Sequence, residues 1–452
     1  MTYSSSISVA TNPPNAALYQ LQGLDFQGLP PETHMRIEVR HQDAAGWDWG
    51  ASFAGQTDAE GQLTMGAVKG AGEAADSLTW LWNLQPIAGE AALIEAVQRG
   101  TLIGLAPALE TPLSPLELDL TVLLDGDAIF ASPLSLPRCP KSVRAETIQH
   151  QKLRGQWFRP IDQAVRGAVL VLGGSEGGIV PARAAALAAE GYAALALGYF
   201  DYEDRPKAAS NLPLDYFEAA LAWMGEQVPG EKRFVWGGSR GSEAALLSAV
   251  HFSALVDGVI GWVPGPLVHT GFDMVGGTDF AVIEDPMWTL KGVPVPGAPH
   301  LPVTAARQSA RERAYSSMPG YRYTAEFRDL WATPGLGKPY GIPIEQVKAP
   351  VLLVGAEDDG IWPSAEGAEI LLARHQQRGG EATVEAIILP KAGHALGMPN
   401  EPRPYSHVAY WQGGYSGVEG GFIDQGGTPE TNAKAARDGW AAALRFLGCD
   451  AV

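Results

Sequence analysis

A serine flanked by glycines is the residue pattern in this 452-residue chain that most directly indicates covalent chemistry. Gly237-Gly238-Ser239-Arg240-Gly241 follows a short apolar segment, Phe234 to Trp236, and precedes an Ala- and Leu-rich segment. Glycines at these places permit a sharp strand-to-helix turn that exposes the serine hydroxyl. The N-terminus of the following helix favours negative charge that develops there. The pattern therefore predicts that Ser239 is a nucleophile.

A serine at neutral pH is a weak nucleophile, so it needs a base, and the base needs a carboxylate that holds it in the right tautomer. In α/β-hydrolases these partners follow in the order serine, acid, histidine. The apolar strand expected at Val351 to Gly355 ends in an acidic loop that contains Asp358 and Asp359. We expect Asp359 to be the acid because Pro363 lies four residues on, the spacing usual in such loops; Asp358 is the alternative.

The base is expected just past the next apolar strand, where His394 ends the sequence Pro390 to His394. His407 is near enough in sequence to be a second candidate. His375 is expected on a polar helix face, and His251 is expected to be structural at the far end of the helix after the nucleophile. The spacing therefore predicts His394 as the base.

The tetrahedral intermediate of acyl transfer also needs an oxyanion hole. One backbone N–H normally comes from the residue after the nucleophile, here Arg240, and another from the Gly-rich turn after an early strand. That turn is Gly173 to Gly178, so Ser175 or Glu176 should supply the second N–H. A dinucleotide-binding loop is disfavoured because the turn lacks the G-x-G-x-x-G spacing and no acidic residue follows at the expected place.

Alternating strands and helices after Lys141 predict the scaffold that positions these residues. Their succession indicates a parallel sheet covered by helices, that is, a doubly wound α/β domain over residues 141–452. The expected strands are 167–172, 192–197, 233–237, 258–263, 351–355 and 386–389, and the expected helices are 182–190, 214–224, 242–250, 365–378 and 431–447. Between Pro264 and Pro350, many Pro and Gly residues and no long periodic helix predict a lid-like insert.

The first 140 residues have a different pattern, of strands and turns with little helix. Met35 to His41 alternates apolar and polar residues, as a half-buried strand does. Leu116 to Val122 repeats the alternation, and Asp125-Gly126 then offers a tight turn into a second strand. We expect an all-β sandwich over residues 1–140.

Composition excludes several classes of protein. The chain has 46% hydrophobic and 18% charged residues, as a globular enzyme does, and its formal net charge of −18 disfavours nucleic acid and anionic membranes as partners. No secretory signal or membrane-spanning run is expected. Cys139 and Cys449 are too few for a disulfide framework, which suits the cytoplasm. We expect no cofactor and no metal, and the sequence gives no indication of oligomeric state.

Taken together, these segments resemble the acyl-CoA thioesterase and bile acid-CoA:amino acid N-acyltransferase family over nearly the whole chain. The Ser239 elbow, the segments Gly173 to Arg183 and Leu214 to Ala220, Asp358 to Trp362 and Gly393-His394 match it in order. Further matches are Lys152 to Gly155, Gly426 to Pro429 and Asp76 to Leu84, which is similar to the family's tryptophan-bearing strand.

The resemblance implies an immunoglobulin-like domain before the hydrolase domain and a triad of Ser239, Asp359 and His394. Three features depart from the family pattern. Arg240 stands where the family commonly has lysine, Glu176 lies in a mostly glycine turn, and the insert at 264–350 is longer than usual. These departures concern the substrate more than the mechanism.

Hydrolysis of an acyl thioester such as acyl-CoA is the function we expect. Coenzyme A is polyanionic, and residues 291–348 hold eight basic residues against four acids, so Arg307, Arg311 and Arg313 are candidate substrate-binding residues. A solvated lid surface would have the same composition. The alternatives are an ester, amide or lactone hydrolase, an acyltransferase to an amine, and a non-catalytic binding protein on a hydrolase scaffold.

Overall fold

A computed structural model of the chain describes residues 7–66, 78–102, 104–273, 281–299, 304–411 and 420–449. Contacts between residues divide the chain into two units. The N-terminal unit consists of residues 1–140 and 397–406, and the larger unit consists of residues 141–396 and 407–452.

The N-terminal unit contains two antiparallel sheets. The five-stranded sheet has the order β6-β4-β3-β7-β8, and the three-stranded sheet has the order β1-β2-β5. Their bounds are β1 (Ser8–Asn12), β2 (Gly23–Gln27), β3 (His34–Gln42), β4 (Asp48–Gln56), β5 (Leu63–Gly66), β6 (Gln85–Pro86), β7 (Leu116–Leu124) and β8 (Asp127–Leu136). The alternation predicted at Met35 to His41 is confirmed, since β3 alternates buried and exposed residues along its length.

The β7–β8 hairpin forms at the predicted turn. Asp125 and Gly126 both have positive φ, 50° and 92°, which a two-residue hairpin turn requires. Two features were not predicted. Residues expected to form a tryptophan-bearing strand contain a helix, α1 (Thr79–Trp82), and a further helix, α2 (Glu90–Gln98), buries Leu93 and Val97. The η1 turn (Leu18–Gln20) completes the elements of this unit.

A distant segment of the chain, residues 397–406, belongs to the N-terminal unit. The Asn400 side-chain amide donates to the carbonyl oxygens of Leu18 (3.0 Å) and Leu21 (2.9 Å). The buried Arg138 guanidinium pairs with Glu401 (Nε–Oε1 3.1 Å). These contacts explain why a segment so close to His394 in sequence is part of the first unit.

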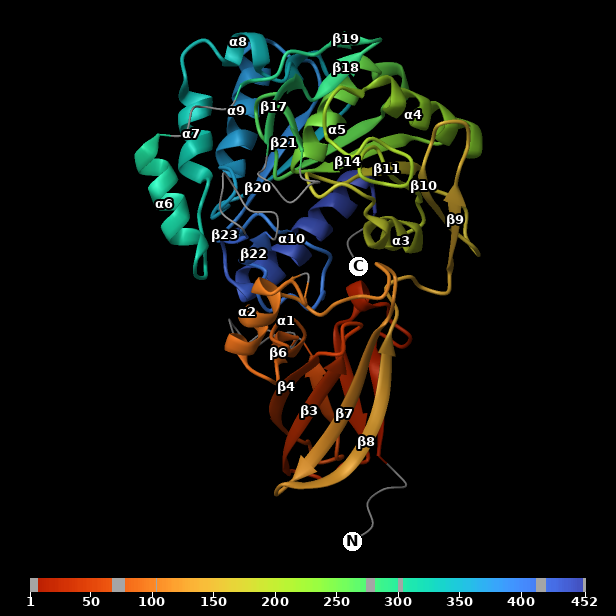
Figure 1. Cartoon of the computed structure of the whole chain (residues 1–452). Coiled ribbons are helices and arrows are strands. Elements are labelled where there is room, and N and C mark those ends of the chain that lie inside the picture. The colour runs from red at the N-terminus through yellow and green to blue at the C-terminus, as the bar shows by residue number, and fades with distance from the viewer. Residues whose placement is uncertain are drawn as a thin grey trace. The chain divides into compact units, whose positions relative to one another are not determined.

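The larger unit is built on an eight-stranded sheet with the order β21-β20-β15-β14-β11-β12-β10-β9 (Figure 1). The first six strands are parallel, as predicted, and β10 and β9 extend the sheet in antiparallel fashion. Their bounds are β9 (Val143–Ile148), β10 (Gly155–Pro160), β11 (Ala168–Leu172), β12 (Ala193–Leu197), β14 (Arg233–Gly238), β15 (Gly258–Trp262), β20 (Val351–Ala356) and β21 (Val384–Leu389).

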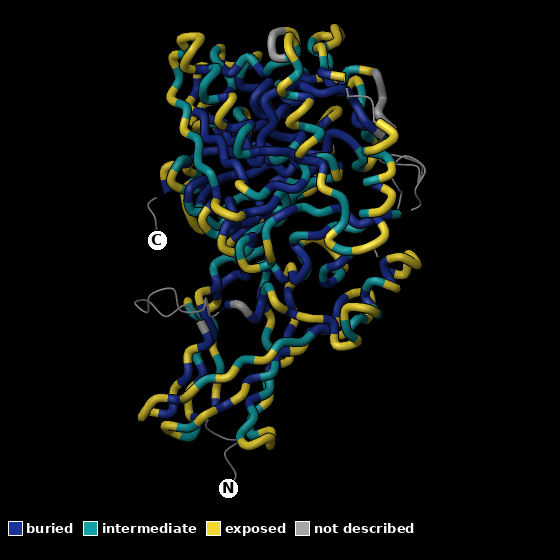
Figure 2. Tube along the Cα trace, turned by 90° about the vertical axis from the view of Figure 1, so that its left-hand side faces the viewer, coloured by how far each residue is buried: buried dark blue, intermediate teal, exposed yellow. Residues whose placement is uncertain are grey.

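Helices cover both faces of this sheet, so the predicted doubly wound arrangement is confirmed. One face packs against α4 (Asp215–Gln227), α5 (Arg240–His251) and α9 (Ser364–Gln377) in one large hydrophobic core. The other face carries α3 (Pro181–Ala189) and α10 (Pro429–Leu447), where Trp440 stacks on Trp236 with ring centroids 5.7 Å apart. Buried residues therefore fill the interior of the larger unit (Figure 2). No helix among the described residues is long and apolar enough to cross a bilayer.

The insert expected between Pro264 and Pro350 is more helical than the sequence predicted. It contains α6 (Ala305–Tyr315), α7 (Thr324–Ala332) and α8 (Gly337–Tyr340). Thr304 caps α6 by accepting from the Arg307 N–H. The short elements of this unit are β13 (Leu212–Pro213), η2 (Ser253–Leu255), β16 (Thr270–Asp273), β17 (Ala281–Pro286), β18 (Trp288–Leu290), β19 (Val293–Pro294), η3 (Ile344–Gln346), β22 (Val408–Trp411) and β23 (Gly421–Asp424).

Candidate active site

Ser239 lies on a sharp turn between β14 and α5. Its φ of 53° and ψ of −121° are unfavourable for a residue with a side chain, so the surrounding contacts must hold it there. The Ser239 N–H donates to the Trp262 carbonyl (2.9 Å). Glycine is required at two neighbouring places, because a Cβ on Gly237 would strike the Gly241 carbonyl and a Cβ on Gly241 would strike the Gly173 carbonyl. The sequence thus produces the expected elbow.

A continuous chain of hydrogen bonds runs from this serine to a buried carboxylate. The Ser239 Oγ lies 3.0 Å from His394 Nε2, and His394 Nδ1 lies 2.8 Å from Asp359 Oδ2. The His394 side chain is 13% exposed, and that of Asp359 is completely buried. A carboxylate only accepts hydrogen bonds, so the His394 proton sits on Nδ1 and leaves Nε2 free to accept from the serine hydroxyl. This is the geometry of a nucleophile, a base and an orienting acid.

The acid loop fixes the orientation of the Asp359 carboxylate. Its other oxygen, Oδ1, accepts from the N–H groups of Ile361 (2.9 Å) and Trp362 (3.1 Å). The insert braces the same loop, because the Thr324 hydroxyl donates to the Asp359 carbonyl (2.7 Å) and the Tyr323 N–H donates to the Gly360 carbonyl (2.9 Å). The carboxylate therefore presents Oδ2 to His394.

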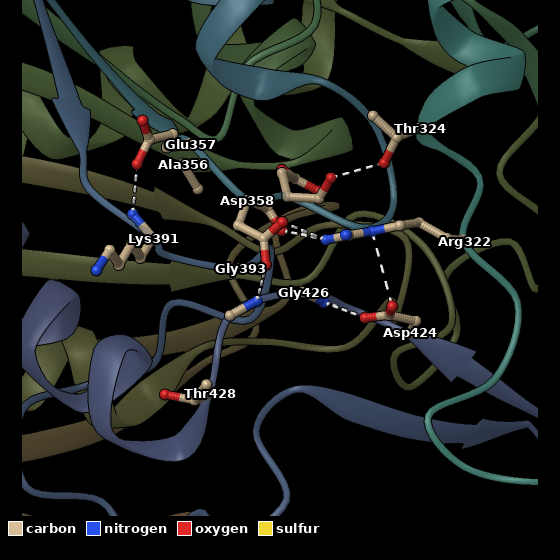
Figure 3. Close-up of polar contacts among 12 residues, drawn as sticks. Arg322, Thr324, Ala356, Glu357, Asp358, Lys391, Gly393, Asp424, Gly426 and Thr428 are labelled. Atoms are coloured by element: carbon tan, nitrogen blue, oxygen red, sulfur yellow. Dashed lines mark hydrogen bonds and ion pairs between the residues drawn. The ribbon is translucent and has the colours of Figure 1, made fainter.

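Asp358, the alternative acid, has different partners (Figure 3). Its Oδ1 accepts from Arg322 (2.8 Å), and its Oδ2 accepts from the Gly427 N–H (2.8 Å). Arg322 also lies 3.7 Å from Asp424 and donates to the Asp358 carbonyl (2.6 Å). Asp358 therefore connects the acid loop to the insert and to the segment before α10, whereas the histidine contacts Asp359.

The histidine loop rests against that same segment. The His394 N–H donates to the Gln425 carbonyl (2.7 Å), and the Gly393 N–H donates to Asn432 Oδ1 (2.7 Å). A Cβ on Gly393 would strike the Gly426 carbonyl, which explains the glycine. The loop thus holds the ring of His394 against Ser239.

The other candidate histidines lie elsewhere. His407 supplies a backbone carbonyl that accepts from the Gln425 N–H (2.8 Å). His251 ends α5, and burial lowers the pKa of its ring. The prediction for His375 was wrong in one respect, because its side chain is buried in α9 and not on a polar face. The ring that contacts Ser239 is that of His394.

The Gly-rich turn packs directly on the nucleophile, and the contact is made by Gly174. A Cβ on Gly174 would lie 3.1 Å from Ser239 Cβ and 3.1 Å from the Gly238 carbonyl oxygen. Ser175 is half-buried and Glu176 is exposed. Arg240 is the first residue of α5, where backbone N–H groups have no partner within the helix. Both predicted sources of oxyanion donors therefore lie beside Ser239.

This geometry agrees with a family model. The model described as "BAAT / Acyl-CoA thioester hydrolase C terminal" matches residues 212–450, more than half of the chain, and includes Ser239, Asp359 and His394. The chain belongs to this family. The predicted family resemblance is confirmed, and the protein is a hydrolase enzyme with an α/β-hydrolase catalytic unit.

Curated relatives of this family match over both units. Human acyl-coenzyme A thioesterase 1 is 27% identical over 428 residues, which cover 92% of this chain and 89% of that protein. Human acyl-coenzyme A thioesterase 6 is 25% identical over 431 residues, with the same coverage of 92% and 89%. Human mitochondrial acyl-coenzyme A thioesterase 2 is 27% identical and is covered over 78% of its length.

Solved structures of hydrolases are more distant. A thermostable esterase from Pseudomonas putida is 18% identical, with a TM-score of 0.36 and coverage of 68% of this chain and 81% of that chain. A dienelactone hydrolase from Anabaena variabilis is 16% identical, with a TM-score of 0.30 and coverage of 56% and 88%. Likeness at this level gives no indication of a substrate.

A buried charged cluster that the sequence did not predict lies beneath the elbow of this family member. Glu243 Oε1 accepts from Arg240 (2.9 Å) and lies 2.7 Å from His269 Nδ1, and its Oε2 accepts from the Trp288 indole N–H (3.3 Å). The side chains of Glu243 and His269 are completely buried, and that of Arg240 is 3% exposed. No motif indicated the cluster, because His269 lies in the insert and Glu243 is one acid in an apolar helix.

The surroundings of Glu243 and His269 shift the pKa values of both side chains. Burial would raise the pKa of the Glu243 carboxyl, but Arg240 and His269 outweigh it and lower that pKa. Burial lowers the pKa of His269 against the opposing effect of Glu243. At neutral pH, Glu243 is therefore ionised and His269 is neutral. Its Nδ1–H donates to Glu243, and its Nε2 accepts from the Trp331 indole N–H (3.4 Å).

One tryptophan separates the two histidines. Trp362 stacks on His269 (centroids 5.6 Å apart, 19° between planes) and meets His394 edge-on (5.7 Å, 81°). Its indole N–H donates to the Val263 carbonyl (3.0 Å), next to the Trp262 carbonyl that holds Ser239. The buried cluster and the hydrogen-bonded chain that ends at Asp359 are therefore packed against one another through Trp362.

The three arginines expected to bind substrate lie on α6 of the insert. Arg311 is buried, pairs through two nitrogens with Glu326 and lies over the rings of Tyr321 and Tyr323. Arg307 pairs with Asp329, and Arg313 is exposed. The charges of Arg307 and Arg311 are therefore offset within the insert. Among the described residues, no three His, Cys, Asp or Glu side chains gather as a metal site would need.

Proposed function

We propose that Ser239, His394 and Asp359 form a catalytic triad that cleaves an acyl thioester through an acyl-enzyme. The observation that supports this most strongly is the hydrogen-bond chain from Ser239 Oγ through His394 to Asp359, at 3.0 and 2.8 Å. His394 Nε2 takes the hydroxyl proton as Oγ attacks the carbonyl carbon, and it returns the proton to the departing sulfur. Water then attacks the acyl-serine by the same steps, releasing the free acid.

The oxyanion of each tetrahedral intermediate would accept from backbone N–H groups on two sides of Ser239. Arg240 supplies one from the start of α5, and the turn that carries Ser175 and Glu176 supplies the other. Contact of Gly174 with Ser239 Cβ supports this assignment, since it brings the turn beside the nucleophile. Donors fixed in this way stabilise the charge without having to reorient during the reaction.

Coenzyme A is the carrier that we propose for the acyl group, because the curated relatives are named acyl-coenzyme A thioesterases. Water is the proposed acceptor because the elbow carries serine. An acyl-serine is an ordinary ester. It reacts with amines in preference to water less strongly than the thioester that a cysteine at the same position would form. We also infer that the N-terminal unit is an immunoglobulin-like sandwich, which its two antiparallel sheets support.

The nucleophile is tested by covalent labelling. The wild-type protein should react with a fluorophosphonate and hydrolyse acyl-CoA, whereas Ser239→Ala should fold, remain unlabelled and lose at least about a hundredfold in turnover. A screen across acyl-CoAs, aryl esters and amides then identifies the substrate class. Retention of more than about 1% of activity by Ser239→Ala would place the nucleophile elsewhere.

The carrier is tested through the insert. If Arg307, Arg311 and Arg313 bind the phosphates, neutralising them together should raise KM for acyl-CoA and leave a small neutral aryl ester unaffected. Added salt should have the same effect, because it screens the attraction between exposed arginines and phosphates. The screening distance is about 8–10 Å at physiological ionic strength and becomes shorter as salt is added. Arg313→Gln alone is the informative variant, because Arg311 braces the insert through Glu326. Equal effects on both substrates would indicate a disturbed insert.

A further inference from the structure

The Gly-rich turn beside the nucleophile carries one acid, and its carboxylate folds back over the turn. Glu176 Oε1 accepts from the Gly174 N–H at 2.9 Å. A Cβ added to Gly174 would lie 2.8 Å from Glu176 Oε2 and 3.1 Å from Ser239 Cβ. A carboxylate oxygen and the nucleophile's Cβ therefore both lie within about 3 Å of one point.

This carboxylate is accessible and lacks a counter-charge. Glu176 is exposed, so a bound substrate can reach it. Within the part of the chain that the structure describes, no Lys, Arg or His side chain forms an ion pair with Glu176. Asp201 is different, since it lies against Gly177 in the same turn but pairs with Lys207 (3.0 Å). The charge of Glu176 is thus the one on this turn that remains uncompensated.

An uncompensated anion at this place opposes the chemistry of a neutral substrate. Negative charge develops on the carbonyl oxygen beside the turn, and two like charges a few ångströms apart repel each other. The field of Glu176 also reaches the interior. Burial, then Glu176 and Glu243, raise the pKa of Tyr199, whose hydroxyl donates to the Gly173 carbonyl (2.7 Å). A substrate that brings a cation would remove the repulsion.

We propose that Glu176 makes the enzyme selective for substrates with a cationic group within about four bonds of the scissile carbonyl carbon. An ammonium on the acyl group is one source of this charge, and a quaternary ammonium on the leaving group is the other. The inference rests on the proposed role of Ser239, because it concerns the substrate of the same site. Glu176 acts on specificity, and the bond-breaking steps stay those of the triad.

Matched thioesters test this selectivity. On the acyl side, 3-aminopropanoyl-CoA is compared with butanoyl-CoA, in which a methyl group replaces the ammonium. On the leaving-group side, butanoylthiocholine is compared with the butanoyl thioester of 3,3-dimethylbutanethiol. We expect the wild-type kcat/KM to favour the cationic member of at least one pair by about tenfold, as expected for attraction between opposite charges near a protein surface. The pair that shows the preference identifies the side that carries the cation.

Substitution at Glu176 separates charge from turn structure. Glu176→Gln retains an acceptor for the Gly174 N–H but removes the charge, so it should lower kcat/KM for the cationic thioester, raise it for the neutral one and bring their ratio near one. Glu176→Gly should act in the same direction. Asp201→Asn is the control, and it should leave the ratio as in the wild type.

Two results would overturn the inference. One is a wild-type enzyme that shows no cationic preference in either pair. The other is a Glu176→Gln variant that loses activity on both members equally, which would make Glu176 a structural cap of the turn. Failure of the proposed function is a separate result, because the wild type would then neither react with a fluorophosphonate nor cleave any of the four thioesters.

Discussion

The larger unit contains two carboxylate–histidine pairs with nearly the same geometry and very different surroundings. Asp359 and His394 are joined at 2.8 Å, and Glu243 and His269 at 2.7 Å, through Nδ1 in both histidines. The difference is at Nε2. In His394 this nitrogen faces the Ser239 hydroxyl at 3.0 Å, and in His269 it accepts from the Trp331 indole N–H at 3.4 Å.

A carboxylate partner therefore does not make a histidine a base. Both pairs fix the tautomer in the same way, but only His394 offers its second nitrogen to a group that can lose a proton. The second pair also includes Arg240, so Glu243 is held between a cation and a neutral ring. That arrangement fixes the first residue of α5, whose backbone N–H we assign to the oxyanion hole. In the proposed mechanism, the first pair acts on the proton, and the second pair positions the elbow.

Replacing the acid of the first pair should have the largest effect. Asp359→Asn should reduce kcat by about 10⁴-fold with little change in stability, because an amide no longer holds the Nδ1–H tautomer of His394. Asp358→Asn is the matched control and should cost less than about tenfold, since Asp358 contacts Arg322 and Gly427. Steady-state kinetics on the same acyl-CoA decides it, and the reverse ranking would transfer the role to Asp358.

Replacing the acid of the second pair should act on stability instead. Glu243→Gln leaves the buried Arg240 guanidinium without its counter-charge, so the free energy of unfolding should fall by about 3–5 kcal/mol. The kcat of the protein that remains folded should fall less than that of Asp359→Asn. Chemical denaturation measures the free energy of unfolding. Titration of the active site with a fluorophosphonate gives the concentration of folded enzyme, from which kcat is calculated.

Glu345→Gln is the control for that variant, because Glu345 pairs with Arg374 through both oxygens (2.7 and 2.9 Å) on the partly exposed side of α9. It should lower stability less and leave kcat unchanged. If Glu243→Gln proved as stable as the wild type but as inactive as Asp359→Asn, the second pair would take part in the chemistry and the contrast between the pairs would fail.

The sequence predicted the first pair and missed the second for a physical reason. The elbow, the acid and the base each follow a sheet strand, and parallel strands bring their carboxyl ends to one edge, so chain order alone locates them. The strands and helices of the larger unit were predicted for the same reason, since continuous apolar runs such as Ala168–Leu172 can only be buried strands or helices.

Local patterns carry no such information about the second pair. Glu243 and His269 meet where the start of the insert contacts α5, since Arg240 also donates to the Thr270 carbonyl. This contact depends on tertiary packing. The same limit explains the helices α6 and α7, since Pro and Gly between them obscure the short periodic stretches. It also explains why Arg311 was expected to bind substrate, because the number of basic residues in a segment cannot show that Glu326 neutralises the Arg311 charge.

The smallest effect that distinguishes the pairs is the pH dependence of stability. Burial lowers the pKa of His269 below its ordinary value, so on acidification the unfolded chain takes up a proton at that histidine before the folded protein does. The free energy of unfolding should therefore fall as the pH decreases from 7.5 through 6.5 to 5.5, with a slope of at most about 1.4 kcal/mol per pH unit for one group. Glu243 has a lowered carboxyl pKa and contributes in the same direction only at lower pH.

His251 contributes to this slope as well, because burial also lowers its pKa. Urea titrations at several pH values on wild type, His269→Gln and His251→Gln separate the two contributions. Each single variant should flatten the slope in part, and the double variant should flatten it further. Neither single variant should lose the pH dependence of kcat that arises from the proposed base, His394. A slope that becomes steeper in His269→Gln would mean that His269 holds its proton more tightly in the folded protein than in the unfolded chain, against the direction expected from its burial. The second pair would then be an ion pair, and the contrast with His394 would rest on the partner of Nε2 alone.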